Sequence, residues 1–159
     1  MAVEALTSID CNEAARLIAA LPLFQQYDFN FERAKAALET ALKDQNQECL
    51  VARENGKIAG VAWFVKDGGF ARSGYLRLIA VAPKHQCSGV GKKLIAELES
   101  RYLTHNGIFI LATSTNVHAR EFYERLGYRK VGEIQDFVKK GLTEVIYYRS
   151  AGVPGRAED

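Results

Sequence analysis

One short stretch constrains this chain more than any other: an apolar, strand-like run leads into a glycine turn that opens an amphipathic helix. The run Leu76–Val81 is followed, after Pro83, by Gly89 and Gly91, and the helical pattern continues to Leu98. A helix that begins at such a turn directs several unpaired backbone N–H groups, and the positive end of its dipole, at one point. The sequence therefore predicts an anion site, and phosphate is the anion that suits it best.

Two common phosphate-binding motifs share this strand–turn–helix order, but the chain has neither spacing. A P-loop here needs glycine at position 86 and Ser or Thr at 93, where the chain has Gln86 and Lys93. A dinucleotide fingerprint that starts at Gly89 needs a third glycine at 94, where Leu94 stands. What remains is a Gln-x-x-Gly-x-Gly turn, with an ordinary glycine-opened helix as the alternative. Positive or chargeable groups surround it: Lys84, His85, Lys92 and Lys93.

A second pattern follows the helix and a buried strand expected at 107–113. The segment Asn116–Tyr128 has the form Asn-x-x-Ala-x-x-Phe-Tyr-x-x-x-Gly-Tyr. Asn116 suits a helix N-cap, and Gly127 suits the left-handed position just past a helix C-terminus. Phe122 is interpreted as a core residue, whereas Tyr123, about 100° further around the helix, faces a different environment.

Together, the two patterns resemble the acetyl-CoA site of the GCN5-related N-acetyltransferase (GNAT) family. The resemblance implies that the turn binds the pyrophosphate of acetyl-CoA and that the strand before it pairs with the pantetheine arm. It also implies that Tyr123 protonates the departing thiolate of CoA. The donor-binding residues that it implies are Ile79, Ala80, Val81, Gln86, Cys87, Ser88, Gly89, Val90, Gly91, Lys92 and Asn116.

The resemblance further implies transfer of an acetyl group to a primary amine by direct attack in a ternary complex. The acceptor is expected to be a small-molecule or peptide amine, with contacts from Tyr27, Arg72, Tyr75 and Phe137. A base must remove a proton from the attacking ammonium, whose pKa is near 10.4 in free amines. Family members often carry a Glu in the strand before the turn, where this chain has Arg77 and Leu78. Other candidates for the base are Glu32, Asp67, His118 and Asp136.

Two alternatives to this function remain open. In one, Cys87 acts as a nucleophile with His85 as its base, although no third orienting group is evident in the sequence. In the other, the chain is a non-catalytic acyl-CoA-binding sensor or regulatory subunit with the same fold, against which the intact Tyr123 argues.

Composition narrows the class of protein. With 159 residues, 48% of them hydrophobic, the chain suits one domain over residues 1–150 and a loose tail at 151–159. A net charge of +2 and a pI of about 8.4 are too mild to indicate nucleic acid. Cys11, Cys49 and Cys87 have neither zinc nor disulfide spacing, so we expect no metal and a reducing compartment. Without a signal core or a membrane-length apolar run, we expect a cytoplasmic monomer or homodimer with no membrane partner.

The order of elements predicts an α/β fold. Asn55-Gly56 is a strong hairpin signal, a second turn is expected at Asp67–Gly69, and the segment Leu21–Asn30 has no periodicity. Helices are expected at Asn12–Ala20, Phe31–Leu42, 89–103 and 116–126, and strands at Val3–Thr7, Glu48–Arg53, Lys57–Val65, Ser73–Ala82, 107–113, 128–135 and 143–149. Helix 89–103 implies a parallel crossover. The GNAT resemblance implies a central mixed sheet of about six to seven strands flanked by about four helices.

Overall fold

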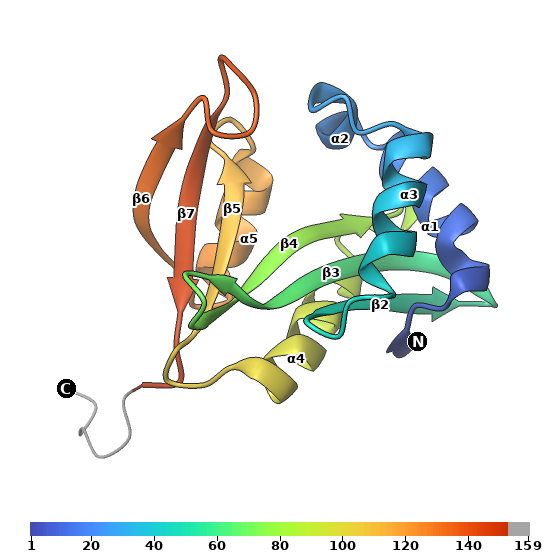
Figure 1. Cartoon of the computed structure of the whole chain (residues 1–159), viewed down its shortest axis with the longest axis horizontal. Coiled ribbons are helices and arrows are strands. Elements are labelled where there is room, and N and C mark those ends of the chain that lie inside the picture. Colours follow the sequence, from blue (N-terminus) through green and yellow to red (C-terminus); the bar gives the residue numbers. More distant parts are fainter. Residues whose placement is uncertain (153–159) are drawn as a thin grey trace. The chain divides into compact units, whose positions relative to one another are not determined.

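The structure is a computed structural model that describes residues 1–152, with seven strands and five α-helices in this part (Figure 1). The strands are β1 (Ala2–Ala5), β2 (Gln47–Glu54), β3 (Lys57–Gly69), β4 (Ser73–Val81), β5 (Ile108–Thr113), β6 (Arg129–Gln135) and β7 (Thr143–Arg149). The helices are α1 (Cys11–Ala20), α2 (Pro22–Gln26), α3 (Phe31–Ala41), α4 (Val90–Tyr102) and α5 (Val117–Arg125). The strand order β1-β2-β3-β4-β5-β7-β6 confirms the expected mixed sheet.

The chain divides into two compact units. Unit 1 comprises Met1–Lys66 and Arg77–Arg101, and unit 2 comprises Asp67–Leu76 and the chain from Tyr102 onward. One domain over residues 1–150 stays a prediction. The expected tail lies outside the described residues from position 153 on.

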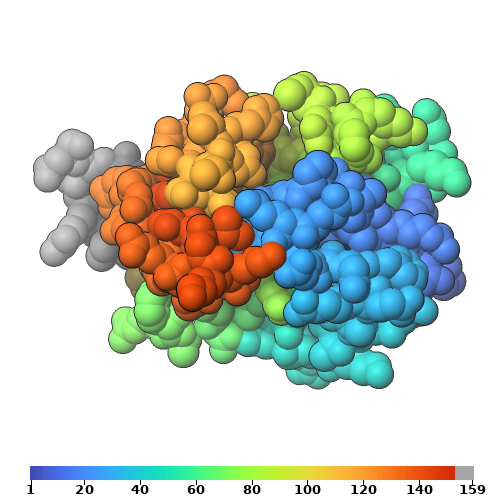
Figure 2. Space-filling model, turned by 90° about the horizontal axis from the view of Figure 1, so that it is seen from above, coloured from blue at the N-terminus to red at the C-terminus, as the bar shows by residue number. Residues whose placement is uncertain are grey.

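Unit 1 is a set of antiparallel strands with helices on both faces (Figure 1). Asn55 and Gly56 form the predicted hairpin turn, both with positive φ. Helices α1 and α3 pack over one face, with Ile18 and Leu38 fully buried in the core that they form there. In Figure 2 these two helices form a continuous surface, in blue and light blue.

Helix α4 covers the other face of the unit 1 strands (Figure 1). Its apolar side carries Val90, Leu94 and Leu98, which are all buried. Gly60 of β3 allows this approach, because a Cβ there would stand 2.6 Å from Cγ1 of Val90. Arg101, near the helix end, pairs with Glu48 of β2. The strands of unit 1 therefore hold α4 along its length.

Unit 2 is built around β5. The first part of β4 runs parallel to β5, with Gly74 opposite Ile108, as the crossover predicted. Strand β7 pairs antiparallel with both β5 and β6. Gly127 ends α5 with a φ of 92°, and its N–H donates to the carbonyl of Glu124, as expected for a left-handed helix end.

Two local expectations are wrong. The segment Leu21–Asn30 contains the five-residue helix α2, which Pro22 starts by fixing φ at its first position. The turn expected at Asp67–Gly69 lies inside β3, and the chain reverses instead at residues 70–71, both with a φ of 57°. Gly69 serves close packing, since a Cβ there would stand 2.7 Å from the Phe109 ring.

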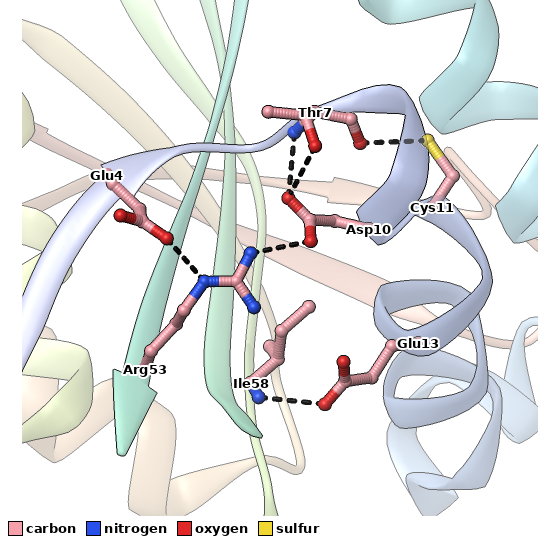
Figure 3. A network of polar contacts seen from close by, with 7 residues as sticks. All are labelled: Glu4, Thr7, Asp10, Cys11, Glu13, Arg53 and Ile58. Atoms are coloured by element: carbon pink, nitrogen blue, oxygen red, sulfur yellow. Dashed lines mark hydrogen bonds and ion pairs between the residues drawn. The ribbon is translucent and has the colours of Figure 1, made fainter. Parts of the chain in front are cut away.

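A polar network joins the start of α1 to the strands of unit 1 (Figure 3). The Asp10 carboxylate accepts hydrogen bonds from the N–H and hydroxyl of Thr7 and pairs with Arg53, which also pairs with Glu4. Burial acts to raise the pKa of Asp10, but the bonds from Thr7 and Arg53 outweigh it, so this pKa lies below its ordinary 3.8. Ionised Asp10 therefore stabilises the folded state.

We predict that Asp10→Asn lowers the free energy of unfolding at pH 7 by about 1.5–3 kcal/mol, the usual contribution of hydrogen bonds to a charged group. Because folding depresses this pKa, the contribution is complete above pH 3.8 and is lost as the pH falls through the folded-state value. Urea denaturation from pH 7 to pH 3 measures the difference between the two proteins, which should shrink with the pH.

The matched control is Glu4→Gln, which removes the more exposed partner of Arg53 and should cost less than about 1 kcal/mol. Equal costs for the two variants, or a difference that does not change with pH, would contradict the assigned role of Asp10.

Candidate functional site

The glycine turn that precedes α4 leaves a row of backbone donors at the helix start. The first hydrogen bond into the helix runs from the N–H of Lys93 to the carbonyl of Gly89, at 3.0 Å. Within residues 1–152, the N–H groups of Gly89, Val90, Gly91 and Lys92 donate no hydrogen bond. Unpaired N–H groups at the positive end of a helix dipole are the features from which the sequence predicts an anion site.

The turn is held in an unusual backbone conformation. Cys87 and Gly89 have φ angles of 61° and 90°, and the space beside the Gly89 Cα is open, with no heavy atom within 4 Å of an added Cβ. A left-handed non-glycine residue such as Cys87 stores backbone strain. Side chains secure the turn: Gln86 Nε2 donates to the Val81 carbonyl at 3.3 Å, and the Ser88 hydroxyl donates to the carbonyl of His85.

Some of the polar groups expected at the anion site are engaged within the protein itself. The Ser88 N–H donates within the turn, to the carbonyl of His85 at 3.4 Å, so the donor row begins at Gly89. The His85 ring lies on the strand side, where its Nδ1 is 2.8 Å from a carboxylate oxygen of Glu54. The positive charge at the turn comes from Lys84, Lys92 and Lys93, which are exposed and form no ion pair within residues 1–152.

Tyr123 lies in a cluster of aromatic rings in unit 2. Its ring centroid is 5.4–6.3 Å from those of Phe122, Tyr128 and Tyr147. Tyr123 is 5% exposed, and Phe122, which we expected in the core, is partly exposed. Burial and then the neighbouring Tyr75 raise the pKa of Tyr123 well above 10. The Tyr123 hydroxyl therefore carries its proton at any physiological pH.

Helix α5 has well-defined ends, which fix the position of Tyr123. Asn116 is the N-cap, as predicted, and its side-chain oxygen accepts from the N–H of Ala119 at 3.2 Å. Two further hydrogen bonds bind the helix to β7, because the Tyr147 hydroxyl donates to Glu124 and accepts from Arg120. This buried contact ties the helix to the strand beneath it.

The expected acceptor contacts are spread over both units. Tyr27 is a half-buried residue at the end of α2 in unit 1. In unit 2, Arg72 lies exposed in the turn before β4, Tyr75 lies half-buried in that strand, and Phe137 lies exposed between β6 and β7. Tyr75 is the second cause, after burial, of the raised pKa of Tyr123.

The four candidate bases, Glu32, Asp67, His118 and Asp136, are all exposed. The Asp136 carboxylate accepts a hydrogen bond from the N–H of Gly141 at 2.6 Å and so stabilises the loop between β6 and β7.

Within residues 1–152, no group of three or more His, Cys, Asp or Glu side chains is arranged to hold a metal ion. In the same part of the chain, no helix combines the length and apolar character needed to span a membrane.

Comparison with known proteins identifies the family. A profile of the acetyltransferase (GNAT) domain matches residues 14–148, most of the chain. The chain belongs to the GNAT acetyltransferase family. A search of curated proteins finds no match.

Solved GNAT structures share this fold at low sequence identity. A GNAT acetyltransferase from Bacillus cereus has a TM-score of 0.76 at 19% identity, over 94% of this chain and 96% of that one. An aminoglycoside 6'-N-acetyltransferase in complex with coenzyme A has a TM-score of 0.78 at 14% identity, over 99% and 100%. The yncA protein of Salmonella typhimurium, solved with acetyl-CoA, has a TM-score of 0.76 at 19% identity, over 99% and 97%. These likenesses establish the GNAT fold.

One cluster in unit 1 was missed by the sequence analysis. Arg77 of β4 lies over the ring of Trp63 in β3, with the guanidinium carbon 4.0 Å from the ring centroid. The indole N–H donates to the Gln47 side chain at 2.8 Å. Sequence alone marked only the arginine in an otherwise apolar strand, at the place where a Glu is frequent in the family.

The three cysteines of this GNAT protein are thiols in different environments. Cys11 and Cys49 are buried, and burial raises the pKa of both thiols, that of Cys49 to about 12. Cys87 is exposed. Because the thiolate is the reactive form, these environments predict different reactivities.

We expect a thiol reagent at pH 8 to modify Cys87 rapidly and to leave Cys11 and Cys49 intact until urea is added. Absorbance of the released thiolate counts one fast group in the native protein and three in the unfolded one, and Cys87→Ser should abolish the fast phase. Peptide mass spectrometry that finds Cys49 modified in the native protein would contradict this assignment.

Proposed function

We propose that this GNAT protein transfers the acetyl group of acetyl-CoA to a primary amine of a small molecule or peptide. One observation carries the proposal: four backbone N–H groups at the start of α4 donate no hydrogen bond within residues 1–152, and the space beside the Gly89 Cα is open. With three exposed lysines around the turn, they suit the two phosphates of a pyrophosphate. The coenzyme A and acetyl-CoA of the related structures support this choice of donor.

The second part of β4 is proposed to bind the pantetheine arm. Strand β4 pairs with β5 over Gly74–Leu76, and Ile79, Ala80 and Val81 lie beyond these pairs. Backbone N–H and C=O groups of an extended strand suit the amides of pantetheine, which add like a further strand. The Val81 carbonyl already accepts a bond from Gln86 and retains a second lone pair.

Tyr123 is proposed to donate the proton that the departing thiolate needs. Burial raises the pKa of Tyr123, so the phenol stays protonated at neutral pH, and the phenolate that could act as a base is not populated. Direct attack by the amine then needs no covalent enzyme intermediate. A cytoplasmic location and a monomeric or homodimeric state stay predictions.

We expect acetyl-CoA to stabilise the protein, by about 2.7 kcal/mol at a concentration 100 times its dissociation constant. Gly89→Ala should weaken this effect, since a methyl group would enter the open space beside the donor row. Gly56→Ala is the matched control, because Gly56 has a φ of 75° and equally open surroundings in the β2–β3 hairpin.

Thermal unfolding with and without the ligand measures both effects. No shift of the wild-type melting temperature at millimolar acetyl-CoA would remove the donor site from the proposal. Equal shifts in the two glycine variants would remove the turn as the place where the pyrophosphate binds.

We predict that Tyr123→Phe lowers turnover about 100-fold or more, the usual effect of losing a general acid, with little change in acetyl-CoA affinity. Tyr128→Phe is the matched control, because it removes a hydroxyl from another buried ring of the same cluster. Thiol release with a panel of amines gives the rates. Unchanged turnover in Tyr123→Phe, under conditions where the chemical step limits the rate, would contradict the acid role.

Acetyl-CoA binding without thiol release for any amine of the panel would instead favour the non-catalytic sensor.

The thiol mechanism has one observation in its favour. Glu54 pairs with His85 and thus supplies the orienting group that the sequence did not show. The same assay decides between the mechanisms, because Cys87→Ser leaves turnover intact in direct transfer and abolishes it if Cys87 is the nucleophile.

A further inference from the structure

Unit 1 contains a hollow of about 250 Å³ that is distinct from the glycine turn. Alanines of α3 and the side chains of Thr40, Gln47, Trp63 and Arg77 line it. This volume lies just below the usual range for drug-sized ligands, so the hollow suits a small molecule. We call it the Arg77 hollow.

The single charge that lines the Arg77 hollow is a guanidinium that lies over an aromatic ring. The Arg77 guanidinium carbon is 4.0 Å from the ring centroid of Trp63, which is 2% exposed, and no ion pair of Arg77 occurs within residues 1–152. The Trp63 ring is itself fixed, because its N–H donates to Gln47, whose amide nitrogen in turn donates to Asp44. A guanidinium that contacts a ring in this way still has N–H groups that can bind an acceptor.

The other lining groups define the chemistry of the ligand. They are methyl groups, an indole ring, an amide engaged in two hydrogen bonds and the hydroxyl of Thr40. A carboxylate matches the fork of an arginine with two parallel hydrogen bonds, and the methyl groups suit a short aliphatic chain. The nearest acidic group on this hydrogen-bonded chain, Asp44, does not line the hollow and accepts from Gln47 and Asn46.

The position of Arg77 relates the hollow to the reaction. Arg77 precedes Ile79 by two residues, about 6.6 Å along an extended strand. Under the proposed function, Ile79 belongs to the segment that binds the pantetheine arm, and that arm ends at the thioester. A ligand whose carboxylate lies on Arg77 can therefore direct an amine a few carbons away toward the thioester.

We propose that the Arg77 hollow binds the carboxylate of a small aliphatic amino acid and that this amino acid is the acetyl acceptor, a step that rests on the proposed function. Arg77 is then the residue that selects acceptors by charge. Trp63 acts through Arg77, as a positioning residue.

Binding is tested without acetyl transfer. Trp63 is the one tryptophan of the chain, so intrinsic fluorescence reports on the Arg77 hollow. The probes are amino carboxylates from glycine to 5-aminopentanoate and their neutral amides. We expect a saturable change with at least one carboxylate and none with its amide. Arg77→Gln should weaken binding about tenfold or more, the usual loss for a charge-assisted pair, and Arg77→Lys should restore part of it.

The matched control is Arg16→Gln. Arg16 is also an exposed arginine of unit 1 beside an aromatic ring, with its guanidinium carbon 5.7 Å from the Phe31 centroid, and it does not line the hollow. Its loss should leave probe binding unchanged. A wild-type protein that binds no carboxylate probe, or an Arg77→Gln protein that binds as tightly as wild type, would overturn the site.

The acceptor role is tested separately, by thiol release from acetyl-CoA. For the carboxylate that binds, kcat/KM should exceed that of its amide, and Arg77→Gln should lower it about tenfold while sparing the amide. Equal use of carboxylate and amide would overturn the acceptor role, whatever the fluorescence shows. Loss of acetyl-CoA binding would overturn the proposed function and would leave the fluorescence result intact.

Discussion

The first turn of α4 carries a constraint on which the candidate site depends: its leading N–H groups have no partner within the helix. In this protein the turn before them has a defined backbone conformation, because Cys87 and Gly89 adopt positive φ and Gln86 ties the turn to the end of β4. The sheet then fixes the helix itself. Gly60 admits α4 close to β3, and a charged pair with Glu48 holds the helix near its other end. The strands of unit 1 thus position a set of backbone donors, and the side chains of the turn mainly secure it.

Much of the fold could be predicted because its signals are local. Asn-Gly at 55–56 needs positive φ, which only a few residue types adopt readily, and Asn116 and Gly127 mark helix ends through bonds within four residues. The two errors have different causes, a glycine that serves packing and a helix that is very short. Gly69 suggested a turn, yet it removes a side chain that would collide with Phe109. The helix α2 is too short to show a period in the sequence.

The site was predictable to a different extent in its two halves. The proposed donor site lies in one continuous stretch of chain, so a spacing of glycines was enough to suggest it. The Arg77 hollow is assembled from α3, β2, β3 and β4, and its key contact joins residues 14 positions apart in sequence, Trp63 and Arg77. Such a contact depends on which residues of β3 and β4 lie opposite each other, and the sequence pattern alone does not give this strand register. An isolated arginine in an apolar strand was the one available signal, and it was interpreted only as a missing Glu.

The difference between the two halves has a physical reason, because one relies on backbone groups and the other on side chains. Backbone N–H groups at a helix start are available to any sequence that keeps the turn. Solved structures with 14–19% identity to this chain share its fold. Acceptor recognition instead relies on side chains, which differ at most positions at that level of identity. A change from carboxylate to guanidinium on β4 would reverse the charge offered to an acceptor without disturbing the strand, because the side chain at position 77 is exposed. Membership of the GNAT family therefore predicts the donor, whereas the acceptor must be inferred from residues such as Arg77.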